Sequence, residues 1–463
     1  MNPSLERTFA VLATAVTVLS VLAVVAAPTA ADGRDAVAFD PGVPAEYTFT
    51  APTADGSAEV GGQSFETLQA AVAAAESGET VVLRGRLEGP VEVNESDVTL
   101  SSAPGRLALV EGDGEGDVVT INARNVTLDG IWVRTSGYET ADNDAGIWVN
   151  GTNARVVDSR VTDVTFGVWI DGVDDVHLTN NTIVGRESVY PLSNRGNGVQ
   201  IWKSDGSVVA DNRITDVRDG IYYSWASNVL ARGNTMWDLR YGVHYMYSDH
   251  NTLRNNLAFG NDVGYALMVS QDLTIVDNTA VDNTGQSGHG ILVKSIDRTT
   301  IRNNTLVGNG KGLYVYNSLD NTIARNLVLE NGIGVHLTAG SVRESVHHNT
   351  FLGNDEPVRA VVGEQVAWNA SGEGNSEGNF WAGADAADVD GDGVSEVRYQ
   401  PAGVVERLAV REPTARLFTE SPAFAVIRLA ESSVPIVETP GVVDYHPLAT
   451  PPHEHWRRYY DDD

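Results

Sequence analysis

Three residues near the middle of the chain carry side chains that a soft metal ion prefers. His244 and Met246 lie two positions apart, and Met268 follows Met246 by 22 residues. Thioether and imidazole groups suit Cu(I), whereas carboxylate-rich sites suit Ca²⁺ or Mg²⁺. We expect a transient Cu(I) site at His244, Met246 and Met268, which His289 joins if its loop folds over. Alternatively, the methionines form a hydrophobic docking patch, a frequent use of this residue.

A second candidate metal site is an Asp/Gly loop in the last quarter of the chain. Asp388, Asp390 and Asp392 stand at positions one, three and five of a loop that has Gly393 at position six. This spacing matches the first half of a calcium-binding EF-hand loop. Position twelve is Tyr399 rather than glutamate, which excludes a complete EF-hand. The loop is therefore expected to be a Ca²⁺ site or a tight turn without a cation.

The candidate copper ligands belong to a repeat in which a glycine precedes four or five apolar or aromatic residues. Gly220, Gly242 and Gly264 are 22 residues apart, and the pattern can be followed from 146 to 334. A fixed period in the twenties, with short strands and Asn/Gly turns, is typical of a solenoid. The predicted fold is all-β: a right-handed, single-stranded parallel β-helix with an N-terminal helical cap and an irregular C-terminal segment.

Alternation along the strand after each glycine separates a core face from an outer face. The first and third residues after each glycine are apolar, as in Val243 and Tyr245. The second and fourth residues include His244, Met246 and Met268, so the methionines should stack about 5 Å apart on adjacent rungs. Because a monomer does not usually leave an aromatic stripe exposed, the remaining outer residues predict a partner-binding face: Trp148, Trp169, Trp202, Tyr222, Tyr314 and Tyr316.

A second series of short strands follows the first, and most of its members end in asparagine. We expect these asparagines to stack from rung to rung and to tolerate left-handed backbone geometry: Asn180, Asn212, Asn234, Asn255, Asn278, Asn303 and Asn326. Asn180 and Asn303, and also Asn125, begin glycosylation sequons, and the sequence leaves their modification open.

The chain divides into five expected segments: a signal peptide or membrane anchor (1–31), a linker (32–60), an N-terminal cap helix (61–80), the β-helix (81–370) and a C-terminal segment (371–463). The apolar run at 9–27 is typical of a secretory signal. At roughly 19 residues it is also long enough to remain as an anchor. Either outcome predicts an exported protein.

Smaller features complete the predicted architecture. Ser64 is expected to be the N-cap of the cap helix, which should cover the open first coil. Two coils carry extra residues just ahead of the outer strand, near 185–197 and 284–289. In the tail, an apolar side formed by Phe418, Phe424 and Ile427 is expected either to cap the last coil or to dock to a membrane partner.

Composition limits the partners. The chain has 62 acidic and 31 basic residues, a net charge of −31, only three lysines and no cysteine. Excess acid with arginine in place of lysine indicates a halophilic protein, and the negative charge argues against nucleic acid as a partner. Without cysteine there are no disulfides and no thiolate metal sites, so a soft metal would have to use methionine and histidine.

Four motifs occur together: Arg-Tyr-Gly-Val-His-Tyr-Met-Tyr-Ser (240–248) with Asp-His-Asn-Thr after it, 264–270, 290–295, and Asn-Phe-Trp with the Asp/Gly loop (379–402). Together they resemble the NosD family of exported β-helical maturation proteins for nitrous-oxide reductase. The similarity spans roughly 60 to 450. It departs at 395–399, where the family usually has a further acidic residue.

The resemblance implies a non-catalytic partner of an ABC transporter that contains a permease and an ATPase. It further implies that this assembly works with a copper chaperone to mature the copper–sulfide site of the reductase. The protein would then be membrane-associated through its partners or through an N-terminal anchor.

The rival function is that of an extracellular carbohydrate-binding or polyuronate-acting β-helix. Gly-His-Gly (288–290) with Lys294 faintly resembles the polygalacturonase pattern, and Trp148, Trp169 and Trp202 suit a sugar platform. Inverting glycosidases need two carboxylates about 6.5–9.5 Å apart. The second and fourth positions of the rungs around His244 offer no acid, which favours a binding protein without turnover.

Overall fold

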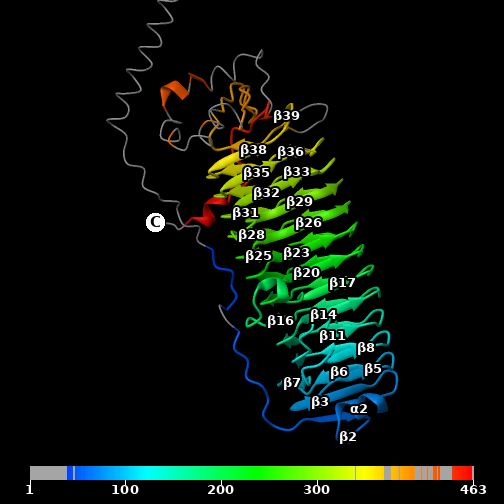
Figure 1. Cartoon of the computed structure of the whole chain (residues 1–463). Helices are drawn as coiled ribbons and strands as arrows, with labels where there is room; N and C mark the ends of the chain where they lie inside the picture. Colours follow the sequence, from blue (N-terminus) through cyan, green and yellow to red (C-terminus); the bar gives the residue numbers. More distant parts are fainter. Residues whose placement is uncertain are drawn as a thin grey trace, which may run out of the picture.

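The computed structural model describes residues 39–44, 47–338, 340–369, 377–384, 386–401, 408, 414, 421–424, 426–427 and 441–460. It confirms the predicted parallel β-helix. Strands follow one another around an elongated solenoid (Figure 1). From β3 onward the strands of the three sheets pair in parallel with the equivalent strand of the next coil, whereas β1 pairs antiparallel with β2 and β3. Each full coil passes through three sheets, of 12, 14 and 13 strands among the described residues.

The 12-stranded sheet carries the strands that follow the repeat glycines: β5 (Val91–Val93), β8 (Val119–Ile121), β11 (Ala145–Val149), β14 (Phe166–Asp171), β17 (Val199–Trp202), β20 (Asp219–Ser224), β23 (Tyr241–Met246), β26 (Val263–Gln271), β29 (His289–Asp297), β32 (Lys311–Tyr316), β35 (Ile333–Leu337) and β38 (Glu356–Ala360).

The 14-stranded sheet contains the second predicted series: β1 (Ser57–Val60), β2 (Gln63–Phe65), β3 (Thr80–Arg84), β6 (Thr99–Ser102), β9 (Thr127–Asp129), β12 (Arg155–Val157), β15 (His177–Thr179), β18 (Val208–Ala210), β21 (Leu230–Arg232), β24 (Thr252–Arg254), β27 (Thr274–Val276), β30 (Thr300–Arg302), β33 (Thr322–Ala324) and β36 (Ser345–His347).

The 13-stranded sheet was not separated in the sequence, because most of its strands follow those of the 14-stranded sheet after only two residues: β4 (Arg86–Glu88), β7 (Ala108–Glu111), β10 (Ile131–Arg134), β13 (Arg160–Thr162), β16 (Thr182–Val184), β19 (Arg213–Thr215), β22 (Thr235–Trp237), β25 (Leu257–Phe259), β28 (Thr279–Val281), β31 (Thr305–Val307), β34 (Leu327–Leu329), β37 (Thr350–Leu352) and β40 (Phe380–Trp381).

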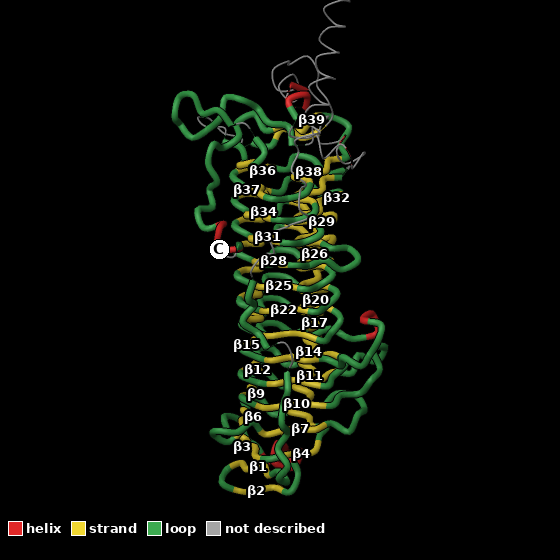
Figure 2. Tube along the Cα trace, turned by 90° about the vertical axis from the view of Figure 1, so that its left-hand side faces the viewer, coloured by secondary structure: helices red, strands yellow, loops and turns green. Residues whose placement is uncertain are grey.

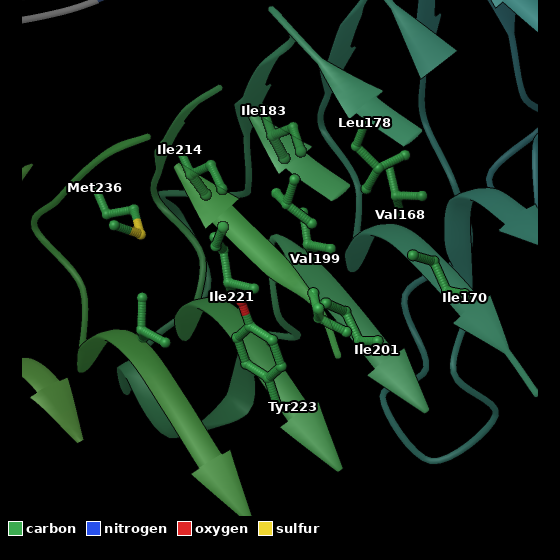
Figure 3. Close-up of a cluster of buried hydrophobic side chains, with 14 of the residues drawn as sticks. Val168, Ile170, Leu178, Ile183, Val199, Ile201, Ile214, Ile221, Tyr223 and Met236 are labelled. Atoms are coloured by element: carbon green, nitrogen blue, oxygen red, sulfur yellow. The ribbon is translucent and has the colours of Figure 1, made fainter. Parts of the chain in front are cut away.

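The core of the solenoid is formed by the inward residues that the alternation predicted. Figure 3 shows Val168, Val199 and Ile221 from successive strands of the 12-stranded sheet facing side chains of the other two sheets, and all three are fully buried. Tyr223 and Tyr245 stack inside the core with ring centres 4.2 Å apart. Burial of aliphatic surface in every coil holds the solenoid together, since the area removed from water is the main favourable term in folding.

Buried asparagines form ladders, but three of the predicted members are wrong. Asn180, Asn255 and Asn303 are exposed corner residues with positive φ of 54°, 53° and 56°. The ladder uses the next residue of those coils, which points inward. Each amide donates to the Oδ1 of the next member at 2.8–3.1 Å: Asn181, Asn212, Asn234, Asn256, Asn278, Asn304, Asn326, Asn349 and Asn379.

Two further polar ladders run through the turns. A second asparagine ladder joins Asn261, Asn283, Asn309, Asn331 and Asn354. The longer ladder ends at Asp444, whose Oδ2 accepts from the Asn379 backbone N–H at 2.7 Å and from Trp381 Nε1 at 2.8 Å. These bonds satisfy amides that would otherwise be buried without a partner.

Another polar ladder in the turns ends at an acid. The buried Glu344 accepts from the backbone N–H and the side-chain amide of Asn321, at 3.2 and 3.3 Å. Burial raises the pKa of Glu344 to about 8. Between about pH 4.5 and 8 the folded chain thus holds one proton more than the unfolded chain, and stability falls as pH rises.

We predict that Glu344→Gln removes this loss. The variant should be more stable than the native chain by about 4 kcal/mol at pH 8 and equally stable near pH 4. Urea denaturation of both proteins at the two pH values measures the difference. The prediction is contradicted if the difference in stability between the variant and the native chain is the same at pH 4 and at pH 8.

The N-terminal region covers two surfaces. The cap helix α2 (Leu68–Ala74) buries Leu68, Ala71 and Val72, but its N-cap is Thr67 rather than Ser64, because the Thr67 hydroxyl accepts from Ala70 N at 3.2 Å. Residues 39–44 and 47–56 lie along one side of the solenoid (Figure 1). Their aromatic residues contact the outer face of the 13-stranded sheet, with Phe39 near Phe259, Tyr47 near Trp237 and Phe49 near Trp132.

The C-terminal residues return to the solenoid. Strand β41 (Gly441–Val443) pairs in parallel with β39 (Gln365–Ala367). The short 3-10 helix η3 (Trp456–Tyr459) places Tyr459 on a small apolar cluster of Val281, Val307 and Leu329. Phe39 packs against the same cluster. Both ends of the described chain therefore cover the 13-stranded sheet.

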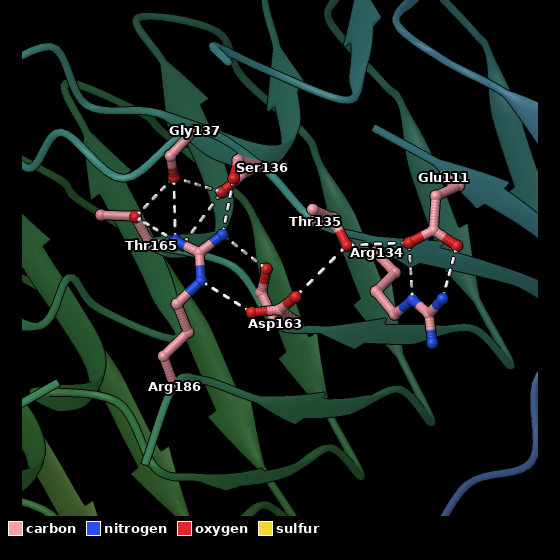
Figure 4. A network of polar contacts seen from close by, with 8 residues as sticks. All are labelled: Glu111, Arg134, Thr135, Ser136, Gly137, Asp163, Thr165 and Arg186. Carbon is pink, nitrogen blue, oxygen red and sulfur yellow. Dashed lines mark hydrogen bonds and ion pairs between the residues drawn. The ribbon is translucent and has the colours of Figure 1, made fainter. Parts of the chain in front are cut away.

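Loops between the 13- and 12-stranded sheets project from one corner (Figure 2). The longest carries the 3-10 helix η1 (Leu192–Asn194). A buried arginine fixes the neighbouring 135–144 loop (Figure 4): Arg186 donates to Asp163, Thr165 and the carbonyls of Ser136 and Gly137. Its guanidinium also lies 3.8 Å from the Tyr138 ring centre. The predicted clustering of long loops at one corner is thus found.

Candidate functional site

The predicted stripe lies on the outer face of the 12-stranded sheet and has three rows. The second row pairs Trp148 with Trp169, Gln200 with Tyr222, Tyr222 with His244, and His244 with Ala266. The third row contains Met246 and Met268. A first row, one residue before each glycine, was overlooked in the sequence, because strict alternation assigns this position to the core. Alternation is interrupted at the glycine, where an added Cβ on Gly220 would meet the core residues Met236 and Leu239, so the residue before it points outward.

His244 is held by a buried ion pair from the first row. Its Nδ1 lies 3.1 Å from Asp219 Oδ2, and Arg240 Nε donates to Asp219 Oδ1 at 2.8 Å. Burial alone would raise the pKa of Asp219, but the hydrogen bonds from His244 and Arg240 outweigh burial and lower it. Since this carboxylate can only accept, Nδ1 of His244 carries the proton.

In the neutral imidazole, the other ring nitrogen of His244 is therefore a lone-pair donor. Nε2 is buried and has no hydrogen-bond partner. The rings of Tyr222 and Tyr241 stand edge-on to the imidazole, with centres 4.6 and 5.0 Å away. A histidine that binds a metal usually donates its second N–H to a carboxylate or carbonyl, which fixes the tautomer and the ring orientation. Asp219 gives His244 this arrangement.

Met246 and Met268 share the third row. The pairing of Val243 with Tyr265 and of His244 with Ala266 places the two methionines at the same register on adjacent strands. Both are half-buried, and Met268 packs against the small apolar cluster that includes Ala266. Met246 follows His244 by two residues, about 7 Å along the strand. The imidazole and the two thioethers therefore lie on one patch.

His289 does not join this patch. It is the first residue of β29 rather than part of the loop, and it pairs with Val263 on one side and Lys311 on the other. Its ring centre lies 5.0 Å from that of Tyr314. Burial, assisted by Lys311, lowers the pKa of His289 to about 4, so the ring is neutral at pH 7. Two rungs separate His289 from His244.

The aromatic stripe residues are less exposed than the sequence analysis assumed. Trp148 and Trp169 are half-buried and stack on each other, with ring centres 5.0 Å apart and planes inclined by 4°. Trp202 is half-buried beside Lys203. A sugar platform needs free aromatic faces, and in this pair each ring covers one face of the other. Of the predicted partner-face residues, Tyr222 and Tyr314 are half-buried and Tyr316 is exposed.

An acid does stand beside the copper candidates, contrary to the sequence argument against a glycosidase. Asp219 lies on the outer face, one rung before His244. It is fully buried and bound to Arg240 and His244, so it has no accessible oxygen for a sugar.

The Asp/Gly loop brings its three carboxylates together. Ligand atoms of Asp388, Asp390 and Asp392 lie within 4.8 Å of one another. Both Asp388 oxygens accept backbone N–H groups, from Gly391 at 2.7 Å and Gly393 at 3.0 Å. A tight Asp/Gly turn fits these bonds, and Ca²⁺ binding here stays a prediction.

The predicted C-terminal docking residues are only partly covered by the structure. Phe418 lies outside the described residues, Phe424 is half-buried, and Ile427 is exposed. Residues 1–31, the expected signal peptide or anchor, also lie outside them. In the part of the chain that is described, no helix has the length and apolar character needed to cross a bilayer.

Comparisons with solved structures return other β-helices. The catalytic unit of an α-1,3-glucanase from Streptomyces thermodiastaticus has a TM-score of 0.49 at 17% identity, with 64% of each chain covered. The A-module of the Azotobacter vinelandii mannuronan C-5 epimerase AlgE4 has a TM-score of 0.42 at 16% identity, covering 64% of this chain and 84% of the module. Neither match bears on what this chain binds.

Sequence comparisons are more specific. Residues 183–386 match a family described as periplasmic copper-binding protein (NosD). A Pseudomonas aeruginosa protein named probable ABC transporter binding protein NosD is 34% identical over 361 residues, which cover 74% of this chain and 82% of that protein. A protein of the same name from Stutzerimonas stutzeri is 31% identical over 387 residues, covering 80% and 86%. The chain therefore belongs to the NosD family.

Proposed function

We propose that this protein is an exported accessory protein of an ABC transporter, and that it holds Cu(I) transiently while the copper–sulfide site of nitrous-oxide reductase is assembled. The observation that carries the proposal is the free Nε2 of His244, fixed by Asp219 beside two methionines. A neutral imidazole and two thioethers are soft donors that favour Cu(I) over Ca²⁺ or Mg²⁺. The names of the relatives support the transporter association.

The proposed protein performs no turnover of its own. Asp219 would set the tautomer of His244, and the tyrosine edges would limit access to its Nε2. The residues of the patch would bind, orient and release the ion without a chemical step. The proposed partners are the transporter permease and ATPase, a copper chaperone and the reductase. The protein would act on the extracytoplasmic face of the membrane, held there by these partners or by an N-terminal anchor.

The test is the copper content of the reductase produced beside a variant of this chain. His244→Ala/Met246→Ala/Met268→Ala should leave the reductase with less copper than it acquires beside the native chain, because no soft donor set remains on the patch. Copper is measured by elemental analysis of the purified reductase.

The matched control is Asp171→Asn, which changes the same row three rungs away from Met246. It should preserve full loading of the reductase. If the triple variant also supports full loading, the copper role of this face is wrong.

A further inference from the structure

A ridge of apolar side chains follows the copper patch at the corner where the 12-stranded sheet ends. Trp225, Tyr247 and Val269 occupy the same position of three successive coils, at the ends of β20 and β23 and within β26. Their exposed fractions are 56%, 47% and 38%. The Trp225 and Tyr247 rings stack with centres 4.8 Å apart and planes inclined by 15°. We call these three residues the corner ridge.

The backbone of the corner ridge is left-handed, with φ of 57° at Trp225, 52° at Tyr247 and 49° at Val269. In other coils the same corner carries Gly172 at 66° and Asn317 at 48°. Glycine and asparagine tolerate this conformation, whereas a bulky residue is strained in it and a β-branched one more so. The fold therefore does not require these three side chains, and both their exposure and their strain oppose folding.

Such strain persists at sites where function requires it. The ridge residues are also continuous with the copper patch, because Met246 immediately precedes Tyr247 and Met268 precedes Val269. Methionine beside aromatic residues makes an adaptable contact surface. An exposed apolar group on a strained backbone does not stabilise the isolated chain. It lowers the free energy only when another surface covers it.

Charge at the two ends of the ridge indicates what that surface carries. Lys203 occupies the same corner one coil before Trp225, and the exposed Lys294 lies one coil after Met268. They are two of only three lysines in a chain with 62 acidic residues. The acids on the turn side are engaged between coils, with Asp205 bonded to Ser227 and Asp249 to Gln271. Four rungs, or about 19 Å along the axis, separate the backbone positions of the two lysines.

We propose that the corner ridge docks a partner protein whose surface presents an apolar strip with a carboxylate near each end. The apolar strip covers Trp225, Tyr247 and Val269, and the carboxylates pair with Lys203 and Lys294. A partner in this position also lies over the copper patch. The choice of candidate partners rests on the proposed function. The three candidates are the transporter complex, the copper chaperone and the reductase.

The test replaces the three ridge residues with the one that the corner prefers, as Trp225→Asn/Tyr247→Asn/Val269→Asn. The variant should melt no lower than the native chain, because the left-handed backbone is relieved. Biolayer interferometry against each purified candidate should show that the variant binds one of them at least about tenfold more weakly than the native chain does. The charge reversal Lys203→Glu/Lys294→Glu should weaken the same complex and flatten its salt dependence.

Two results would overturn the proposal: a native chain that binds none of the three candidates, or a triple variant that binds all of them as tightly as the native chain. A lower melting temperature of the triple variant would assign the ridge to folding instead. Cu(I) titration of the native chain separates the two proposals. If Cu(I) does not bind but the ridge variants lose affinity, the docking surface stands and the copper role falls.

Discussion

Replacing Met246 and Met268 together with alanine should weaken Cu(I) binding by more than about 100-fold, since loss of even an outer-shell partner of a metal ligand typically weakens binding 10- to 100-fold. The native patch offers one imidazole and two thioethers, and the double variant keeps only His244 Nε2. A single nitrogen donor cannot hold the ion against competing thiols and water. Anaerobic competition with a chromophoric Cu(I) chelator measures both affinities.

Two control variants sharpen this experiment. Met236→Leu changes a methionine that is fully buried in the core, so it preserves side-chain volume and should leave Cu(I) affinity unchanged. His289→Gln should also bind normally, because His289 contacts Tyr314 two rungs away from His244. Native affinity in the double variant, or no tight binding in the native chain, would leave the patch as a docking surface only.

Asn278→Ala should destabilise the chain by about 3–5 kcal/mol, the largest loss of stability expected from removing one small side chain. Asn278 Oδ1 accepts from the backbone N–H and the side-chain amide of Asn256, both at 3.0 Å. Its own amide donates to Leu253 O at 3.0 Å and to Asn304 Oδ1 at 3.1 Å. Alanine removes all four bonds and leaves the buried Asn256 backbone N–H without its acceptor, whereas the Asn256 amide keeps its bond to Ala231 O. Urea denaturation followed by circular dichroism measures the loss.

The control for the ladder experiment is Asn255→Gly. Asn255 stands one residue before the ladder, is exposed and has a positive φ of 53°, which glycine adopts without strain. Its substitution should change stability by no more than about 0.5 kcal/mol. If Asn278→Ala is as stable as Asn255→Gly, water replaces the ladder bonds at little cost.

The features that the sequence predicted well are those set by alternation within one strand. The period of two assigned Val243 and Tyr245 to the core and His244 to the outer face, and the structure agrees. Repeat length fixed the register that places Met246 and Met268 in one row. The third sheet escaped prediction because most of its strands follow those of the 14-stranded sheet after only two residues, as β13 does after β12, so the two runs were counted as one.

The missed features depend on neighbours that are distant in sequence. Asp219 was overlooked because the outer face was counted from the residue after each glycine, and its importance arises only from its contacts with Arg240 and His244. The ladder members were misassigned by one residue where two asparagines are adjacent, as in Asn255 and Asn256. Adjacent residues of one type cannot be told apart until the turn places one inward and the other outward.

The carboxylate that ends the long asparagine ladder has a consequence for the order in which the fold is completed. Asn379 is the last amide of the ladder, and its partner Asp444 is 65 residues further along the chain. A solenoid can wind coil upon coil from its N-terminus, because every coil needs only its predecessor. The backbone N–H of Asn379, however, lacks its acceptor until the segment that carries Asp444 has returned to the last coil. A chain truncated before Asp444 would therefore leave this end of the ladder open.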